Sequence, residues 1–150
     1  MNNSDLTLDG STATWTMPPM QGEYQGTYMG TFRFKCYLTP MQSLAANKEY
    51  RELLGAHGAN ASEHDGQLSF ALTQLKHRVI SSPPFWEQPK QNGEMAGSIP
   101  DIGVILAVLD AAIRAEMAFK EKMVKERDLT LKRTITIAEE MLATESEEET

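Results

Sequence analysis

The chain has 150 residues, about the length of one ordinary domain, and carries a formal net charge of -7 with an isoelectric point near 5.0. Hydrophobic residues at 41% and charged residues at 23% are typical of a globular protein, which excludes a wholly disordered chain. The acidic balance leaves no basic field that would collect phosphates, so nucleic-acid binding is disfavoured as the main activity. A single cysteine, Cys36, excludes both an internal disulfide and a cysteine-based zinc site.

The first residues, MNNSDLTLDGSTATW, have neither the basic nor the apolar region of a signal peptide. The longest apolar stretch, IGVILAVL at 102–109, is far shorter than the roughly 20 residues that span a membrane. We therefore expect a protein of a reducing cytoplasm with no membrane partner and no nucleic-acid partner.

The N-terminal part predicts an arm and a β-hairpin. Residues 1–12 are polar and lack periodicity, which favours a flexible arm. The stretch TATWTMPP favours a short strand that Pro18 and Pro19 end. The next β-rich run, TFRFKCYL, alternates apolar and polar residues, and its apolar face carries Phe32, Phe34, Cys36 and Leu38. This run predicts a half-buried strand that forms the second arm of the hairpin.

A first short helix has start and stop signals in the sequence. Thr39 is a suitable N-cap, Pro40 suits the first helical position, and Gln42 follows three residues after the cap. Gly55 stands where a C-terminal glycine cap belongs. The sequence therefore predicts a helix between these two signals.

A second short helix begins with Ser62 as N-cap and Asp65 in the capping-box position. Its apolar residues recur at spacings of three and four, at Leu68, Ala71, Leu72, Leu75 and Val79. We expect this face to pack on the apolar face of the strand. Pro83 and Pro84 are expected to end the helix, because neither can donate a backbone hydrogen bond.

The C-terminal part predicts a long helix after a loop. The run PKQNGEMAGSIP is rich in helix breakers, so we expect a loop or hinge at 89–100. A long helix is predicted over 101–144, with one side formed by Ile102, Leu106, Leu109, Ile113 and Met117. Residues 145–150 are expected to form an acidic, frayed tail.

Residues 128–138, DLTLKRTITIA, fit two patterns. Four apolar residues in this stretch follow a strand period of two. On a helix, apolar residues instead recur every seven positions, at Met117, Val124, Leu131 and Ala138, with Ile135 and Leu142 beside them. We predict helix and leave a break near Asp128 open.

These elements predict an α+β, mostly helical fold. An N-terminal β-hairpin packed on two short helices forms a compact body at 13–88, and a long C-terminal helix follows it.

The sequence contains no motif that predicts catalysis, a metal or a cofactor. The alternation of the strand places Cys36 among apolar side chains, where a cysteine is usually inert. The three histidines, His57, His64 and His77, are not spaced to direct two side chains at one metal. No phosphate-binding loop and no nucleophile elbow occur. We predict a non-enzymatic protein without cofactors.

Phe85 and Trp86, in SSPPFWEQP, allow two interpretations. Burial of a large aromatic side chain stabilises a fold by about 1.5–3 kcal/mol, so the pair could fold back as a plug over the open end of the core. Aromatic residues are also enriched at interface centres, so the pair could instead anchor another subunit. The candidate protein-interaction residues are Phe85, Trp86, Met117, Met123, Val124 and Leu131.

Residues 30–87 contain four features in order: a TFRFKCYL strand that runs into TP, a YRELLG helix end, a LSFALTQLKHRVI helix and a closing PPFW. With these features, the segment resembles small virion-structural or tail-assembly proteins of tailed bacteriophages. The resemblance implies a non-enzymatic, homo-oligomeric virion component, assembly factor or chaperone that binds itself or other virion and tail proteins. Its location would be the host cytoplasm during assembly, or the virion. The alternative is a small cytoplasmic regulatory or adaptor protein that dimerises or binds a partner through its C-terminal helix.

Overall fold

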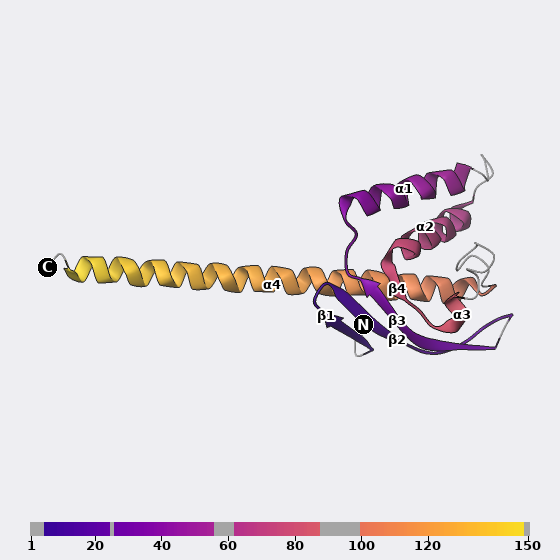
Figure 1. The fold of residues 1–150 in the computed structure, drawn as a ribbon, viewed down its shortest axis with the longest axis horizontal. Coiled ribbons are helices and arrows are strands. Elements are labelled where there is room, and N and C mark those ends of the chain that lie inside the picture. The colour runs from indigo at the N-terminus through magenta and orange to yellow at the C-terminus, as the bar shows by residue number, and fades with distance from the viewer. Residues whose placement is uncertain (1–4, 25, 56–61, 88–99, 149–150) are drawn as a thin grey trace. The chain divides into compact units, whose positions relative to one another are not determined.

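The computed structural model describes residues 5–24, 26–55, 62–87 and 100–148 (Figure 1). Its elements in chain order are β1 (Leu6–Asp9), β2 (Thr12–Gln21), β3 (Thr27–Lys35), α1 (Pro40–Gly55), α2 (Glu63–Arg78), β4 (Val79–Ser81), α3 (Pro84–Glu87) and α4 (Ile102–Glu148). The predicted α+β class is confirmed: an antiparallel sheet comes first, short helices follow, and a long helix ends the chain.

The chain divides into two units, Met1–Glu116 and Met117–Thr150, so that α4 contributes to both. We call the described residues of the first unit the body. We call residues 117–148 of α4 the C-terminal segment. The expected loop or hinge at 89–100 lies outside the described residues, apart from Pro100.

The sheet has four antiparallel strands in the order β1-β2-β3-β4. Residues 6–9, which we expected to lie in a flexible arm, instead form β1, with Leu6 opposite Trp15. The indole Nε1 of Trp15 donates a hydrogen bond of 2.7 Å to the Asp5 carboxylate, which fastens the start of this strand. The arm prediction was wrong for these residues because a strand of four residues carries too little periodicity to be recognised.

Strand β2 does not end at Pro18 and Pro19 as expected but continues to Gln21. Its pairing with β3 shifts register between Met17 and Met20, so both prolines lie at an irregularity of the ladder. A proline is tolerated there because the irregular positions need no backbone donor.

The predicted helix starts are confirmed by their hydrogen bonds. The Thr39 backbone donates to the Gln42 side chain at 3.0 Å, and the Gln42 backbone donates to the Thr39 hydroxyl at 3.3 Å. Ser62 and Asp65 form the same reciprocal pair at the start of α2. Each pair satisfies two backbone donors that the first helical turn leaves open.

Helix α2 ends at Arg78, earlier than the prolines predicted. Residues 79–81 form β4 instead, with Val79 opposite Phe34 and Ser81 opposite Arg33. This pairing satisfies backbone groups at the edge of β3, a gain that local helix signals cannot reveal.

The core of the body lies between the sheet, α2, α3 and the first turns of α4. Three residues of the apolar face predicted from alternation are buried, Phe32, Phe34 and Cys36, whereas Leu38 is half-buried. The strand is shorter than predicted, because β3 ends at Lys35, before Cys36 and Leu38. The helices cover this face with buried residues Ala71, Leu75, Trp86, Val104, Ile105, Val108, Ala111 and Ala112. The alanines of α4 leave room for this part of the helix to approach its neighbours closely.

Helix α4 is continuous from Ile102 to Glu148. Residues 128–138 are therefore helical as predicted, without a break at Asp128, and residues 145–148, expected to be a frayed tail, belong to the helix. The threonines in this region donate their hydroxyls to carbonyl oxygens four residues earlier: Thr130 to Glu126, Thr134 to Thr130, and Thr136 to Lys132. These bonds accommodate threonine, whose branched side chain otherwise favours a strand.

Candidate protein-interaction surface

Phe85 and Trp86 belong to the core of the body. Trp86 is 3% exposed, and its ring lies edge-on to that of Phe32 with centroids 5.3 Å apart. The Phe85 ring is half-buried and packs edge-on against Tyr28 at 5.0 Å. The burial of the pair therefore favours the plug interpretation over a docking surface.

The local backbone explains why the pair turns inward. The Trp86 amide donates to the Pro83 carbonyl at 3.0 Å, which closes the short helix α3. Pro83 lies directly against Gly30, which has a φ of 144° and where an added Cβ would overlap the proline ring. Because Gly30 has no Cβ, the segment that contains Phe85 and Trp86 can pack closely against β3.

Asp101 connects the start of α4 to the β2–β3 hairpin. Its carboxylate accepts hydrogen bonds from the Tyr28 hydroxyl at 2.6 Å and from the Tyr24 amide at 3.0 Å. Burial, the hydrogen bond to Asp101 and the negative charge of Asp101 together raise the pKa of Tyr28 to about 12. This buried pair holds two elements together that are far apart in the sequence.

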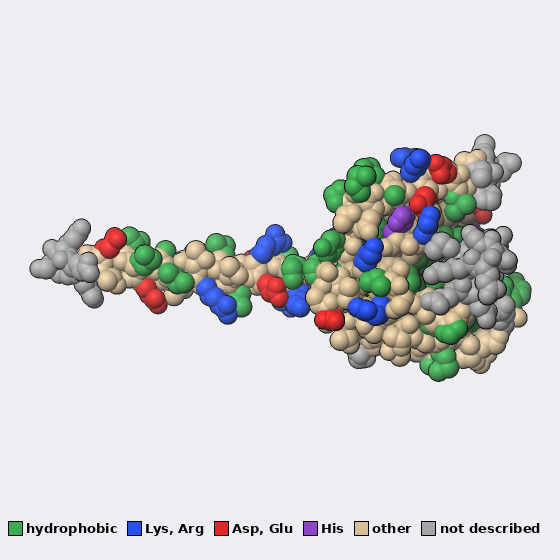
Figure 2. Space-filling model, viewed as in Figure 1, with side chains coloured by type: hydrophobic (Ala, Val, Ile, Leu, Met, Phe, Trp, Pro, Cys, Tyr) green, Lys and Arg blue, Asp and Glu red, His purple; other side chains and the backbone are tan. Residues whose placement is uncertain are grey.

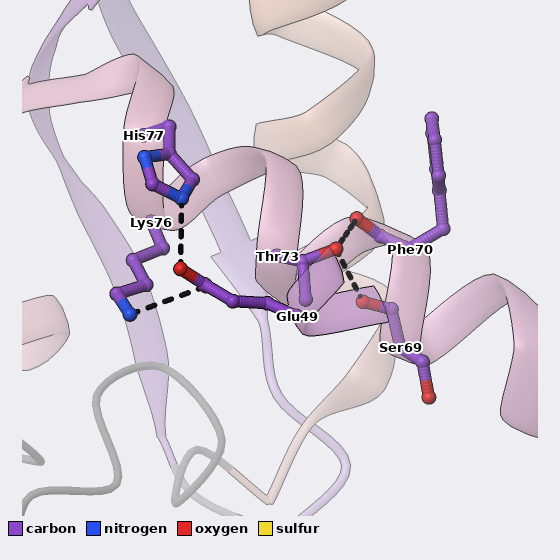
Figure 3. Close-up of polar contacts among 6 residues, drawn as sticks. All are labelled: Glu49, Ser69, Phe70, Thr73, Lys76 and His77. Carbon is purple, nitrogen blue, oxygen red and sulfur yellow. Dashed lines mark hydrogen bonds and ion pairs between the residues drawn. The ribbon is translucent and has the colours of Figure 1, made fainter. Parts of the chain in front are cut away.

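The Glu49 carboxylate connects α1 to α2 (Figure 3). Its carboxylate lies 3.2 Å from Lys76 Nζ and 3.1 Å from His77 Nε2. Partial burial raises the pKa of Glu49, but the hydrogen bonds and charges of Lys76 and His77 outweigh it, so the pKa is lowered overall. Thr73, drawn in the same view, donates to the carbonyls of its own helix at Ser69 and Phe70. These groups serve as structural links between and within helices.

Of the other residues considered for chemistry, the structure describes Cys36 and His64. Cys36 is fully buried in the body, His64 is exposed at the start of α2, and His57 lies outside the described residues. Among the residues that the structure describes, no group of three His, Cys, Asp or Glu is placed to hold a metal ion.

The remaining predicted residues lie on the C-terminal segment, where large apolar side chains are exposed. Met117, Val124 and Leu131 recur every seven residues and are 64%, 45% and 60% exposed. Met123 is less exposed, and it lines a shallow depression with Glu126, Arg127, Thr130, Leu131 and Thr134. Figure 2 shows apolar side chains along the segment between charged ones.

The exposed face extends beyond the residues that we singled out from the sequence. Ile135 and Leu142 are about half or more exposed and continue the same line, four residues after Leu131 and Ala138 respectively. We call Met117, Val124, Leu131, Ile135, Ala138 and Leu142 the apolar stripe. Their spacing was visible in the sequence, where the helical pattern already placed all six residues together.

Comparisons with known proteins do not identify a function for this chain. No family model, no curated protein sequence and no solved structure matches the chain. Within the described residues, no helix combines the length and the apolar character needed to cross a membrane.

Proposed function

We propose that this chain is a non-enzymatic interaction protein, a virion component or assembly factor of a tailed bacteriophage, that binds protein through the apolar stripe. The observation that carries the proposal is the exposure of regularly spaced large apolar side chains along the C-terminal segment. Single exposed apolar residues are ordinary, but an extended row of them marks an interaction site.

The physical gain from covering the stripe is large. Burial of one leucine or isoleucine side chain contributes about 1.5–3 kcal/mol, and the stripe holds several such residues. A helix gains most of its stability from packing an apolar face, and the stripe offers six apolar residues on one side of the segment. Spacings of three and four residues suit knobs-into-holes packing against a second helix.

Protein is a better partner than nucleic acid for this surface. Three acidic residues stand among the six Lys and Arg residues of 117–133, and Lys125 Nζ lies 3.3 Å from the Glu121 carboxylate. The chain as a whole carries a net charge of -7, which would repel a phosphate backbone.

The phage context of the proposal comes from the resemblance of residues 30–87 to small virion and tail-assembly proteins. The same stripe also supports the alternative of a regulatory or adaptor protein, because the exposed row is confined to one helix. A ring or larger oligomer in solution favours a structural virion component. A discrete dimer favours an assembly factor or an adaptor.

A matched pair of variants tests the proposal. Leu131 is 60% exposed and lies on the stripe, whereas Leu129 is 50% exposed and, two residues away, points to nearly the opposite side of the helix. We expect Leu131→Gln to raise the dissociation constant of the assembly at least about tenfold, because its burial is lost. Leu129→Gln should leave it unchanged. Light scattering across a wide range of protein concentrations measures both.

The fluorescence of Trp15 and Trp86 provides the control, because both residues are buried in the body and report its folding. It should be the same in both variants. Equal behaviour of Leu131→Gln and Leu129→Gln in the mass measurement contradicts a role for the stripe.

A further inference from the structure

The charges of the C-terminal segment and the last two residues are separated along the chain. Residues 117–133 contain six Lys or Arg against three Asp or Glu, a net charge of +3. Residues 134–150 contain six Glu and no Lys or Arg, a net charge of -6. On the face shown in Figure 2, the blue side chains of the segment lie in its first half, and the coloured charged side chains further along it are red. We call these stretches the basic block and the acidic block.

This separation opposes the stability of the isolated helix. The C-terminal end of a helix carries a partial negative charge that favours Lys and Arg in the last turn. The last turn of α4 has no basic residue and contains Glu147 and Glu148. The stability of the isolated helix therefore does not explain this order of charges. A binding partner of complementary charge would explain it.

The positions between the stripe residues distinguish the two directions in which copies could pair. The seam of the helix alternates Met117, Val124, Leu131 and Ala138 with Glu121, Asp128, Ile135 and Leu142, at spacings of four and three. In a parallel, in-register pair, Glu121 and Asp128 would each face the same carboxylate of the second copy. The two acidic blocks would also lie side by side, and like charges in such an arrangement repel.

In an antiparallel pair, identical carboxylates no longer face each other, and the two acidic blocks no longer lie side by side. With a two-fold axis near residues 129 and 130, Val124 lies level with Ile135 of the second copy, and Met117 with Leu142. Asp128 then lies level with Leu131 and one residue from the level of Lys132 of that copy. Residues 134–142 of each copy carry a net charge of -2 and lie level with residues 117–125 of the other copy, which carry a net charge of +2, so these two stretches attract.

We infer that two copies of this chain pair antiparallel through residues 117–142 of α4, with the apolar stripes in contact and the basic stretch 117–125 of each copy facing the acidic stretch 134–142 of the other. The inference rests on the proposed function and names the partner as a second copy. The overlap of about 39 Å, at 1.5 Å per residue, corresponds to between three and four heptads, enough for a stable two-helix seam. A closed two-chain assembly fits an assembly factor or an adaptor and does not fit a ring-forming virion component.

Site-directed cross-linking of the full-length chain tests the direction. Met117→Cys and Leu142→Cys are prepared separately and treated with a short thiol-reactive cross-linker, alone and as a mixture. Antiparallel pairing predicts a covalent dimer in the mixture and none with either variant alone, because identical positions lie about 37 Å apart along the axis. The unsubstituted chain is the control, since its Cys36 is fully buried.

The outcomes separate this inference from the proposed function. Cross-linking of each variant with itself overturns the antiparallel arrangement and leaves the stripe as a binding surface. Association in solution without any cross-link in the mixture also overturns it. Equal masses of Leu131→Gln and Leu129→Gln at every concentration overturn the proposed function, and the inference with it.

The dependence on salt provides a second readout. The oppositely charged stretches attract in the antiparallel pair, and salt screens this attraction. Raising the sodium chloride concentration about tenfold from a low-salt buffer should therefore raise the dissociation constant several-fold. A dissociation constant that falls with salt indicates like-charged neighbours and contradicts the antiparallel pair.

Discussion

The two parts of α4 carry similar apolar spacings in opposite surroundings. In the body, Val104, Ile105 and Val108 are covered by the sheet and the short helices, whereas in the C-terminal segment Val124 and Leu131 are exposed. The difference shows that periodicity specifies a face to be packed without specifying what packs against it. In the body the chain supplies its own cover, and in the segment we propose that a second chain supplies it.

The charged groups of the two parts differ in the same way. In the body, some ion pairs lie along one helix, but others join different elements, as Glu49 of α1 does with Lys76 of α2, and Arg78 of α2 with Glu116 of α4. In the C-terminal segment, Glu121 and Lys125 pair along one helix, an arrangement that contributes only a few tenths of a kcal/mol. The polar contacts of the body fix tertiary structure, and those of the segment leave its sides available to a partner.

The largest effect is expected from Trp86→Ala, which removes a buried aromatic from the body. We expect the free energy of unfolding to fall by about 3–5 kcal/mol, because the cavity beside Phe32 cannot be refilled. Denaturant unfolding followed by the fluorescence of Trp15, the other tryptophan, measures the loss.

Tyr24→Ala is the matched control, since the Tyr24 side chain is 72% exposed and its removal should change stability by less than about 0.5 kcal/mol. If Trp86→Ala instead left the body stable and reduced the solution mass, Trp86 would be an interface residue and the comparison between the two parts would fail.

A smaller effect is expected from Tyr28→Phe, which removes the hydroxyl that donates to Asp101. At neutral pH the loss of this buried hydrogen bond to a carboxylate should cost about 1.5–3 kcal/mol. The pKa of Tyr28 is raised from 10.0 to about 12 in the fold, so the protonated phenol stabilises the native state fully below pH 10. That contribution is lost as the pH rises through about 12.

The unsubstituted protein should therefore lose stability over this alkaline range, and Tyr28→Phe should lose less. Denaturant unfolding at neutral and alkaline pH compares the two proteins, with Tyr24→Phe as the exposed control. An identical alkaline loss in the wild type and in Tyr28→Phe would show that the tie between Tyr28 and Asp101 does not stabilise the body.

Features with local signals were predictable from the sequence. The caps at Thr39 and Ser62 act on backbone groups within three residues, and the alternation around Phe34 needs only one strand to be read. The helical phase of the long C-terminal helix was likewise visible in its seven-residue spacing. These local signals do not depend on which distant residues pack against them in the fold.

Features that depend on a distant partner were not predictable. Strands β1 and β4 have four and three residues, and they exist because β2 and β3 offer edges to pair with. The inward turn of Phe85 and Trp86 depends on the contact of Pro83 with Gly30, more than fifty residues away in the chain. The sequence indicated the apolar stripe but not its cover, because nothing in a spacing identifies the surface that lies opposite.

Hydrogen exchange of the full-length protein at low and high concentration tests the central claim most directly. If a second chain covers the stripe, backbone amides in residues 117–142 exchange more slowly at high concentration, while amides of β2 and β3 exchange at the same rate at both. Equal exchange of residues 117–142 at both concentrations, across the range in which the dimer should form, would contradict the account.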